Sequence, residues 1–249
     1  MRQSLKFPRR LIRSLSTSSF AVPCVNYAAH VLAAVEREAS QSASKAAMID
    51  GSTGATTTYG DYAYRVGAAA RGFRAAGVTR GSVVAIHLPN SPEFVIAFTA
   101  LASLGATVTT SNPLYSPTEL AHQFKDSGAS FILTCPPLKP SVEAASKAIG
   151  LSPHAMLVLG EPSASFLTID VSAATSARRA LPEIASVDAA KDVLVLPYSS
   201  GTTGLPKGVA LTHTNLAANI AQTCGVGSSS GMGLLRSDVL LGVLPLYHI

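Results

Sequence analysis

DVLVLPYSSGTTGLPKG, residues 192–208, joins an apolar run to a loop that is rich in hydroxyl groups and glycine. The run from Val193 to Leu196 contains no polar residue, which is typical of a strand buried on both faces of a parallel sheet. Ligands of such sheets bind on the loops that follow the carboxyl ends of the strands. The stretch therefore predicts a parallel α/β sheet with a binding loop directly after one of its strands.

Residues 198–208, which we call the phosphate loop, carry many hydrogen-bond donors and one ammonium group. Gly201 and Gly204 permit backbone angles that let the N–H groups of residues 200–204 converge on one point. Lys207 adds a positive charge on a long side chain, and Pro206 stiffens the turn before it. Further donors are the hydroxyl groups of Ser199, Ser200, Thr202 and Thr203. This combination is typical of a cradle for phosphate groups.

The loop differs from the P-loop of kinases and GTPases, in which Gly-Lys-Ser/Thr follows a glycine and four further residues. Here Lys207 precedes Gly208, and no Ser or Thr follows the glycine. The order of residues therefore disfavours a kinase-type or GTPase-type site. A flexible polar linker is the structural alternative, and the apolar strand directly before the loop argues against it.

Strand and helix patterns alternate along the chain. Apolar, β-rich runs predict strands at residues 82–88, 106–110, 130–135, 155–159, 192–197 and 239–244. Helical spacing and cap patterns predict helices at residues 61–76, 91–104, 116–127, 141–149 and 214–223. Residues 161–191 are weakly patterned and are expected to form a loop-rich connection. The alternation predicts a layered α/β fold with mostly parallel sheets flanked by helices.

Three segments resemble the adenylate-forming superfamily, which includes acyl-CoA synthetases, 4-coumarate–CoA ligases, luciferases and peptide-synthetase adenylation domains. LPYSSGTTGLPKG, from Leu196, resembles the signature of the superfamily. LPLYHI at residues 244–249 resembles its next motif, in which an aromatic–His pair borders the acyl site, although Tyr247 stands where many members have Phe. HLPNSPEF, from His87, followed by GATVTTSNPLYSPTEL, is similar to the N-terminal part of coumarate-ligase-like members. The resemblance covers about residues 27–249.

The resemblance implies a reaction in two steps. A carboxylate attacks the α-phosphate of Mg-ATP and gives an acyl-adenylate and pyrophosphate, and the thiol of CoA then displaces AMP to give a thioester. The implied ligands are ATP, Mg²⁺, CoA and a fatty or aromatic carboxylic acid. The implied nucleotide-binding residues are Ser199, Ser200, Gly201, Thr202, Thr203, Gly204 and Lys207. His248 is the implied catalytic residue, beside the substrate carboxylate or acyl chain, and no residue is predicted to bind a metal.

The resemblance also implies that the chain is the N-terminal part of such an enzyme. Residues 21–249 are expected to form an incomplete AMP-binding domain that lacks the adenine motif, the ribose-binding aspartate and the C-terminal domain. We therefore expect the chain alone not to complete thioester formation, and to leave a sheet edge and apolar faces uncovered. The alternative is a non-catalytic nucleotide-binding fragment or a truncated gene product.

The charge of the chain is concentrated at its N-terminus. Of 19 basic residues, five lie before the first acidic residue, Glu36: Arg2, Lys6, Arg9, Arg10 and Arg13. The remaining 14 basic residues balance the 14 acidic ones, so the composition does not indicate a nucleic-acid surface. Residues 1–20 are rich in Arg and Ser and free of acids, which is typical of an organellar transit peptide. We expect a mitochondrial location, with plastid, peroxisome and cytoplasm as alternatives, and no apolar stretch is long enough for a membrane span.

The cysteines and the remaining histidines give weaker indications. Cys24, Cys135 and Cys224 are far apart and have no metal-ligand spacing, so they are expected to be reduced thiols. His213 could contact the nucleotide, but we expect it to cap the helix that follows. His87 and His122 show no partner in the sequence and are expected to lie at the surface or to be packed.

Overall fold

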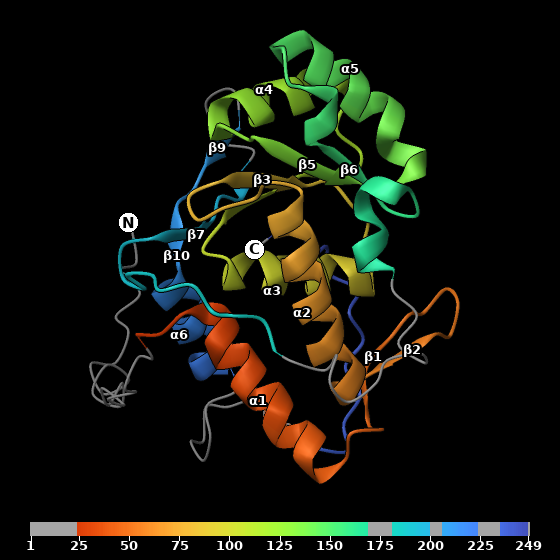
Figure 1. The fold of residues 1–249 in the computed structure, drawn as a ribbon, viewed down its shortest axis with the longest axis vertical. Helices are drawn as coiled ribbons and strands as arrows, with labels where there is room; N and C mark the ends of the chain where they lie inside the picture. The colour runs from red at the N-terminus through yellow and green to blue at the C-terminus, as the bar shows by residue number, and fades with distance from the viewer. Residues whose placement is uncertain (1–23, 169–180, 200–205, 224–234, 249) are drawn as a thin grey trace, which may run out of the picture.

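The computed structural model describes residues 24–168, 181–199, 206–223 and 235–248, and its centre is a six-stranded sheet (Figure 1). The strand order is β10-β7-β4-β3-β5-β6. The bounds are β3 Val83–Ile86, β4 Thr107–Thr110, β5 Phe131–Thr134, β6 Met156–Val158, β7 Val193–Val195 and β10 Leu211–Thr212. All neighbouring pairs are parallel except β10 with β7, which is antiparallel. The predicted fold class, an α/β domain with a mostly parallel sheet, is confirmed.

Helices cover both faces of this sheet. On one face lie α1 Tyr27–Gln41, α2 Tyr59–Ala75 and α3 Pro92–Ser103, and their apolar side chains share a core with β3, β4 and β7. On the other face lie α4 Pro117–Ser127 and α5 Lys139–Ile149, which form a smaller core with β5. Figure 1 shows the sheet between these layers, with α4 and α5 at the top. The helix α6 His213–Thr223 lies beside α1. The helix that follows β3 and the helix that follows β4 thus lie on opposite faces.

The cap residues that were expected to begin these helices do so. Ser91 accepts a hydrogen bond from the backbone N–H of Phe94 at the start of α3. Ser116 and Glu119 form the reciprocal capping box of α4. Gly128 ends α4 with φ +70°, a backbone angle that glycine adopts without the steric cost of a Cβ atom. These caps fix where α4 begins and ends, and α4 borders the candidate site.

Several elements were not predicted. They are α1, the antiparallel hairpin of β1 Ala46–Ile49 and β2 Thr56–Thr58, and the pair of β8 Tyr198–Ser199 and β9 Lys207–Gly208. The 3-10 turns η1 Pro136–Leu138, η2 Pro153–Ala155 and η3 Pro162–Leu167 also lie in segments without a prediction of their own or in the expected loop-rich connection. The predicted transit peptide, residues 1–20, lies outside the described residues.

The strand predicted at residues 239–244 is wrong, because this segment is irregular and exposed in the structure. β7, the strand that enters the phosphate loop, is already paired on both sides, with β4 and with β10. A β-rich sequence forms a strand only where a partner strand is free to pair with it. Among the described residues from 235 onward, the exposed large apolar side chains are those of Leu235, Val239, Leu240, Leu241, Val243 and Leu244.

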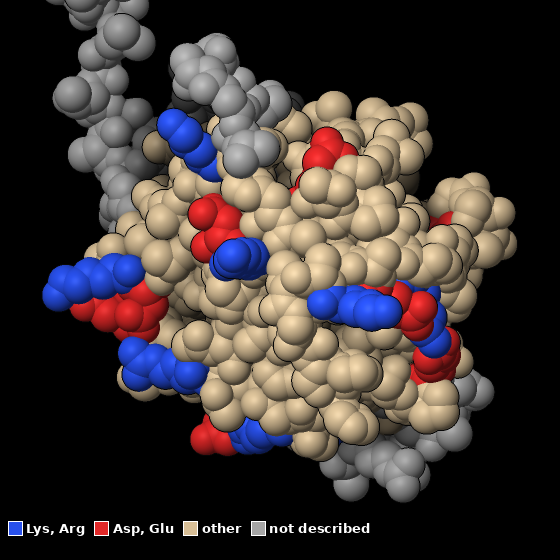
Figure 2. Space-filling model, turned by 90° about the horizontal axis from the view of Figure 1, so that it is seen from above, with Lys and Arg blue, Asp and Glu red and all other residues tan. Residues whose placement is uncertain are grey.

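Charged side chains form small groups of mixed sign over the layer of α4 and α5. Figure 2, which looks onto the molecule from above, shows Lys and Arg side chains next to Asp and Glu side chains, with uncharged surface between the groups. An example is Lys139, whose ammonium lies 2.8 Å from the carboxylate of Glu161. In the described part of the chain, no helix combines the length and the apolar character needed to cross a membrane.

Gly72 in α2 provides a test of the packing. A Cβ atom at this position would lie 2.0 Å from Cγ of Phe166, whose ring packs edge-to-face against Phe73. Gly→Ala in a helix is normally stabilising, but here the added methyl group must displace an aromatic ring. We expect Gly72→Ala to lower the free energy of unfolding by about 1–3 kcal/mol in urea titrations. In a Phe166→Ala background, which removes Cγ and the ring, the loss should be smaller. A Gly72→Ala variant as stable as the wild type would contradict this packing.

Candidate functional site

The candidate site lies at the carboxyl ends of the parallel strands, because β7 leads directly into the phosphate loop. The two ends of the loop pair with each other as β8 and β9, with Tyr198 opposite Gly208 and Ser199 opposite Lys207. The backbone N–H of Val209 donates to the carbonyl of Pro197 (2.9 Å) and closes the base of the loop. The chain therefore leaves β7, forms the loop and returns within a few residues.

The structure brings together the two predicted nucleotide-binding residues that it describes. Ser199 and Lys207 face each other across the β8–β9 pair, and both are exposed. None of the ion pairs formed among the described residues involves Lys207, so its ammonium is available to an anion. The other predicted residues of the loop, Ser200, Gly201, Thr202, Thr203 and Gly204, lie outside the described residues.

The predicted catalytic residue, His248, belongs to a segment that is fastened to the same edge of the sheet. Asn90, which follows β3, donates through Nδ2 to the carbonyl of Leu244 (2.8 Å) and accepts through Oδ1 from the N–H of Leu246 (2.8 Å). Thr110, the last residue of β4, donates through Oγ1 to the carbonyl of Tyr247 (2.7 Å). His248 itself is exposed. The edge of the sheet therefore holds both the phosphate loop and the aromatic–His pair.

Gln123 in α4 links these two parts of the site through β4. Its Nε2 donates to Oγ1 of Thr109 (2.8 Å) and to the carbonyl of Thr110 (3.0 Å). Thr109 in turn donates to the carbonyl of Leu196, two residues before the phosphate loop (2.9 Å). Thr110 in turn holds Tyr247. The buried amide of Gln123 therefore supports both the residues that lead into the phosphate loop and the residue before His248. Sequence analysis did not identify Gln123, because a single Gln in a predicted helix carries no signal of a buried role.

Gln123 also yields a stability prediction. Gln123→Leu removes both donated hydrogen bonds and leaves the carbonyl of Thr110 without this partner in a buried place. We expect the free energy of unfolding to fall by about 1–3 kcal/mol in urea titrations at pH 7. Gln222→Leu, an exposed position on α6, is the matched control and should cost much less. Equal losses in the two variants would contradict the role of Gln123.

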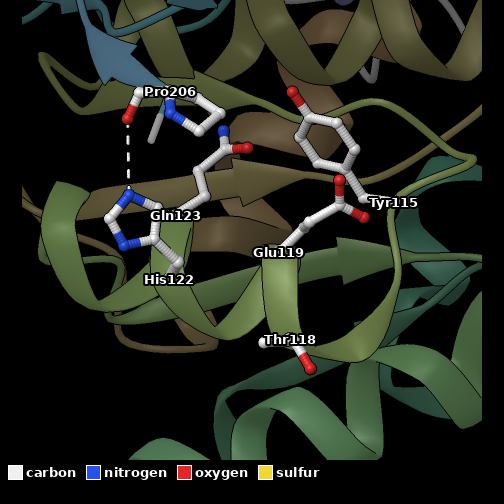
Figure 3. A pocket seen from close by; sticks show the side chains of 6 residues that line it. All are labelled: Tyr115, Thr118, Glu119, His122, Gln123 and Pro206. Atoms are coloured by element: carbon white, nitrogen blue, oxygen red, sulfur yellow. Dashed lines mark hydrogen bonds between the residues drawn. The ribbon is translucent and has the colours of Figure 1, made fainter. Parts of the chain in front are cut away.

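A pocket of about 210 Å³ lies between α4 and the end of the phosphate loop (Figure 3). Its lining residues are Tyr115, Thr118, Glu119, His122, Gln123 and Pro206. Nε2 of His122 lies 3.3 Å from the carbonyl of Pro206, and because a carbonyl only accepts, His122 donates. Burial, and then the charge of Glu119, raise the pKa of Tyr115, so its phenol stays protonated at neutral pH. His122 is partly buried, in agreement with the expectation of a surface or packed side chain, and it contacts the chain at the loop.

The other two histidines have structural places. His213 is 1% exposed and is the first residue of α6, and its Nδ1 accepts a hydrogen bond from the backbone N–H of Tyr27 (3.1 Å). The helix is capped instead by Thr212, whose Oγ1 accepts from the N–H of Asn215, so the predicted capping role of His213 is wrong. Burial lowers the pKa of His213. His87 is fully buried, which agrees with the expectation of a packed side chain.

Among the described residues, no group of three or more His, Cys, Asp or Glu side chains could hold a metal ion. Mg²⁺ in enzymes of phosphate chemistry is commonly held by substrate phosphates together with one or two carboxylates. The ammonium of Lys207 and the hydroxyl of Ser199 are donors that suit phosphate oxygens.

A parallel α/β sheet with a Ser/Thr/Gly loop and a lysine after one strand, and an aromatic–His segment beside it, defines a nucleotide-binding domain of the adenylate-forming type. The family model for AMP-binding enzymes matches residues 35–249, and the chain belongs to this family. The resemblance found in the three sequence segments is thereby confirmed.

Relatives of the chain are CoA ligases. It is 42% identical over 208 residues to "4-coumarate–CoA ligase 5" of Oryza sativa subsp. japonica, with 82% of this chain and 36% of the relative covered. It is 38% identical over 210 residues to "4-coumarate–CoA ligase 3" of Arabidopsis thaliana, again with 82% and 36% covered. The crystal structure of a long-chain-fatty-acid–CoA ligase (FadD1) from Archaeoglobus fulgidus is similar with a TM-score of 0.77 and 27% identity, over 92% of this chain and 44% of that one. The chain thus spans less than half the length of these relatives.

Proposed function

We propose that the protein activates a carboxylic acid with ATP and transfers the acyl group to CoA. The observation that carries this proposal is the 42% identity over 208 residues to a 4-coumarate–CoA ligase. The match to the AMP-binding family, residues 35–249, includes the sheet and the loop. The position of Ser199 and Lys207 at the carboxyl ends of the parallel strands supports it, because such loops bind phosphate ligands.

In the proposed first step, a carboxylate oxygen of the acid attacks the α-phosphorus of ATP. The bond between the α-phosphorus and the oxygen that bridges to the β-phosphorus breaks, and pyrophosphate leaves with its electron pair. The loop donors and the ammonium of Lys207 would hold the β- and γ-phosphates and offset the charge that develops on the leaving group. Mg²⁺ would arrive with ATP and reduce the negative charge of the phosphates.

In the proposed second step, the thiol of CoA attacks the acyl carbon of the adenylate. A thioester forms, AMP leaves, and the thiol proton passes to a base. His248, exposed beside the edge where Thr110 holds Tyr247, would border the acid during both steps. Aromatic acids are the first candidates, since the identity to coumarate ligases is 42% against 27% to the fatty-acid ligase, and fatty acids are the second.

The test is acid-dependent exchange of labelled pyrophosphate into ATP. The chain, and any longer product detected with an antibody against it, is incubated with ATP, Mg²⁺ and one acid at a time: 4-coumarate, benzoate, then medium- and long-chain fatty acids. Exchange above the no-acid background with at least one acid is the expected result for the native product. The absence of exchange with every acid in every native product would contradict the proposal.

The alternative function is a non-catalytic nucleotide-binding protein. The observation that favours it is that Ser199 and Lys207, which face each other across the β8–β9 pair, can bind phosphate groups without an acid substrate. Nucleotide binding without acid-dependent exchange would support this alternative over the ligase.

We further propose that residues 1–20 direct the protein to mitochondria. The five basic residues of this segment, without any acid, support the proposal. A fluorescent protein fused to residues 1–30 is expected to colocalise with a mitochondrial dye, and replacing Arg9, Arg10 and Arg13 by Gln should abolish this. A fusion that stays in the cytosol would contradict the proposal, and import into plastids or peroxisomes would replace it by one of the other locations.

A further inference from the structure

Helix α4 contacts both ends of the phosphate loop. At the entry, the hydroxyl of Tyr198 donates to a carboxylate oxygen of Asp126 at 2.6 Å. At the exit, Nε2 of His122 donates to the carbonyl of Pro206 at 3.3 Å. His122 and Asp126 are four residues apart, so they lie on the same face of the helix. One turn of α4 therefore contacts the loop both at its entry, Tyr198, and at its exit, Pro206.

The Tyr198 contact is well defined. A hydrogen bond to a charged acceptor is shorter and stronger than one between neutral groups. Burial of the ring, and then the bond to Asp126, raise the pKa of Tyr198, so the phenol keeps the proton that it donates. On its other side the ring lies against Gly208. A Cβ atom at position 208 would come within 3.2 Å of the Tyr198 ring. Tyr198 is therefore held between α4 and the returning strand β9.

The exit of the loop is held in a different way. The pocket of about 210 Å³ is lined by Pro206 and by side chains of α4, so close packing does not fill the space between them. Figure 3 shows the hydrogen bond from His122 to Pro206 reaching across at one side of this pocket. Lys207 follows Pro206 directly. The position of Pro206 therefore determines where the side chain of Lys207 leaves the backbone.

The helix itself is anchored to the sheet beneath the site. Gln123, adjacent to His122, is 1% exposed and donates to Thr109 and Thr110 at the end of β4. The helix begins at a capping box and ends at Gly128 in the left-handed conformation, so its register is fixed at both termini. The capping box, Gly128 and the bonds of Gln123 thus fix the position of α4 against the sheet.

We propose that α4 positions the phosphate loop for ATP, with Asp126 and His122 as positioning residues that fix Tyr198 at the entry and Pro206 at the exit. This inference rests on the proposed function, in which the loop binds the β- and γ-phosphates. Neither side chain needs to touch the nucleotide. Their contribution is to hold Ser199 and Lys207 opposite each other before the ligand arrives, so that less conformational freedom is lost on binding.

The variants that test this are Tyr198→Phe, Asp126→Asn and the double variant, with Tyr59→Phe as the matched control. Tyr59 lies at the start of α2, and its substitution removes the same hydroxyl group far from the loop. Each single variant is expected to weaken ATP binding about 5- to 10-fold, as for the loss of a partly exposed hydrogen bond to a charged group. Tyr198→Phe removes the donor of this contact, and Asp126→Asn replaces its charged acceptor by a neutral amide oxygen. The double variant should therefore bind ATP no more weakly than whichever single variant binds it more weakly. Tyr59→Phe should bind ATP like the wild type.

A second readout does not depend on the nucleotide. Exchange of the Val209 amide hydrogen, which closes the base of the loop, should be faster in Tyr198→Phe and in Asp126→Asn than in the wild type and in Tyr59→Phe. His122→Leu should have a similar effect, and His122→Gln, which keeps a donor group, should restore part of the protection. The urea midpoints of these variants should stay close to that of Tyr59→Phe, which separates positioning from loss of the fold.

The two failures can be distinguished. If the wild-type chain does not bind ATP, the proposed function fails, and the exchange of Val209 still decides whether α4 positions the loop. If the wild type binds ATP but Tyr198→Phe and Asp126→Asn bind it equally well, with unchanged Val209 exchange, the positioning role of α4 is overturned.

Discussion

Lys207→Ala is expected to lower the rate of acid-dependent pyrophosphate exchange about 100-fold, which is the typical cost of removing one preorganised group that stabilises charge in a transition state. The reason is the position of the Lys207 side chain. Lys207 lies opposite Ser199 at the end of the loop, is exposed, and forms none of the ion pairs found among the described residues. Its ammonium is therefore free to meet the charge that develops on pyrophosphate.

The matched control is Lys191→Ala. Lys191 is also exposed and lies just before β7, but it pairs with Asp188 on the surface, so its loss should leave the exchange rate unchanged. Lys207→Arg should recover only part of the activity, since the planar guanidinium directs its donors differently from an ammonium. Unchanged exchange in Lys207→Ala would contradict the role of Lys207 in binding phosphate.

The second large effect is a loss of stability in acid that depends on His87. Burial lowers the pKa of His87 from 6.5 to about 4. Nδ1 lies 2.9 Å from Oγ of Ser111, and Nε2 has no hydrogen-bond partner among the described residues. Protonation would place a second N–H in this buried site without an acceptor, so the folded protein keeps the ring neutral.

The direction of the pH dependence follows from this. Above pH 6.5 the ring is neutral in the folded and the unfolded chain, and the full stability is present. Between pH 6.5 and pH 4 the unfolded chain binds a proton that the folded chain does not, so the free energy of unfolding falls as the pH falls. The total loss is about 3 kcal/mol for a pKa difference of this size.

Urea titrations at pH 7 and pH 4.5 would measure this loss. His87→Leu removes the titrating group, so the difference between the two pH values should shrink by most of that amount relative to the wild type. His154→Gln, at an exposed histidine, is the control and should keep the wild-type difference. If His87→Leu loses as much stability in acid as the wild type, another group is responsible. His87→Gln provides a second variant if leucine prevents folding.

The parts of the fold that the sequence predicted are those with strong local signals. Ser91 before Pro92, and the Ser116–Glu119 box, fix helix starts through hydrogen bonds within one turn. The strands from Val83 and from Val193 are apolar on both faces because helices cover both sides of the sheet. Local patterns of this kind are sufficient to establish the α/β class and most helix starts.

The helix α1 was missed although its signals are local, since Asn26 caps it and Ala28, Leu32 and Val35 form its buried face. The other failures involve information that is not local. The segment 239–244 has the composition of a strand, but whether it pairs depends on which strand edges are free. The short strands β8, β9 and β10 have two residues each, which is too short for any period to be visible.

The candidate site likewise contains residues that the sequence identified and residues that it did not. The phosphate loop and the Tyr247–His248 pair were identified from composition and resemblance, because the residues that give each its chemistry are consecutive in the sequence. The supports of the site were not, since Asn90, Thr110, Gln123 and Asp126 are ordinary polar residues whose partners lie far along the chain. The sequence shows no partner for His122, because its contact, Pro206, lies 84 residues further along the chain. Only the fold reveals which of many polar side chains meet at the edge of the sheet.

The central claim is that the loop after β7 binds the β- and γ-phosphates of ATP through Lys207. The most direct measurement is calorimetric titration of the wild type and Lys207→Ala with ATP and with AMP, both in the presence of Mg²⁺. The account predicts that the wild type binds ATP more tightly than AMP, and that Lys207→Ala removes most of this difference while its affinity for AMP stays the same. Equal affinities of the wild type for ATP and AMP, or a preference for ATP that survives in Lys207→Ala, would contradict it.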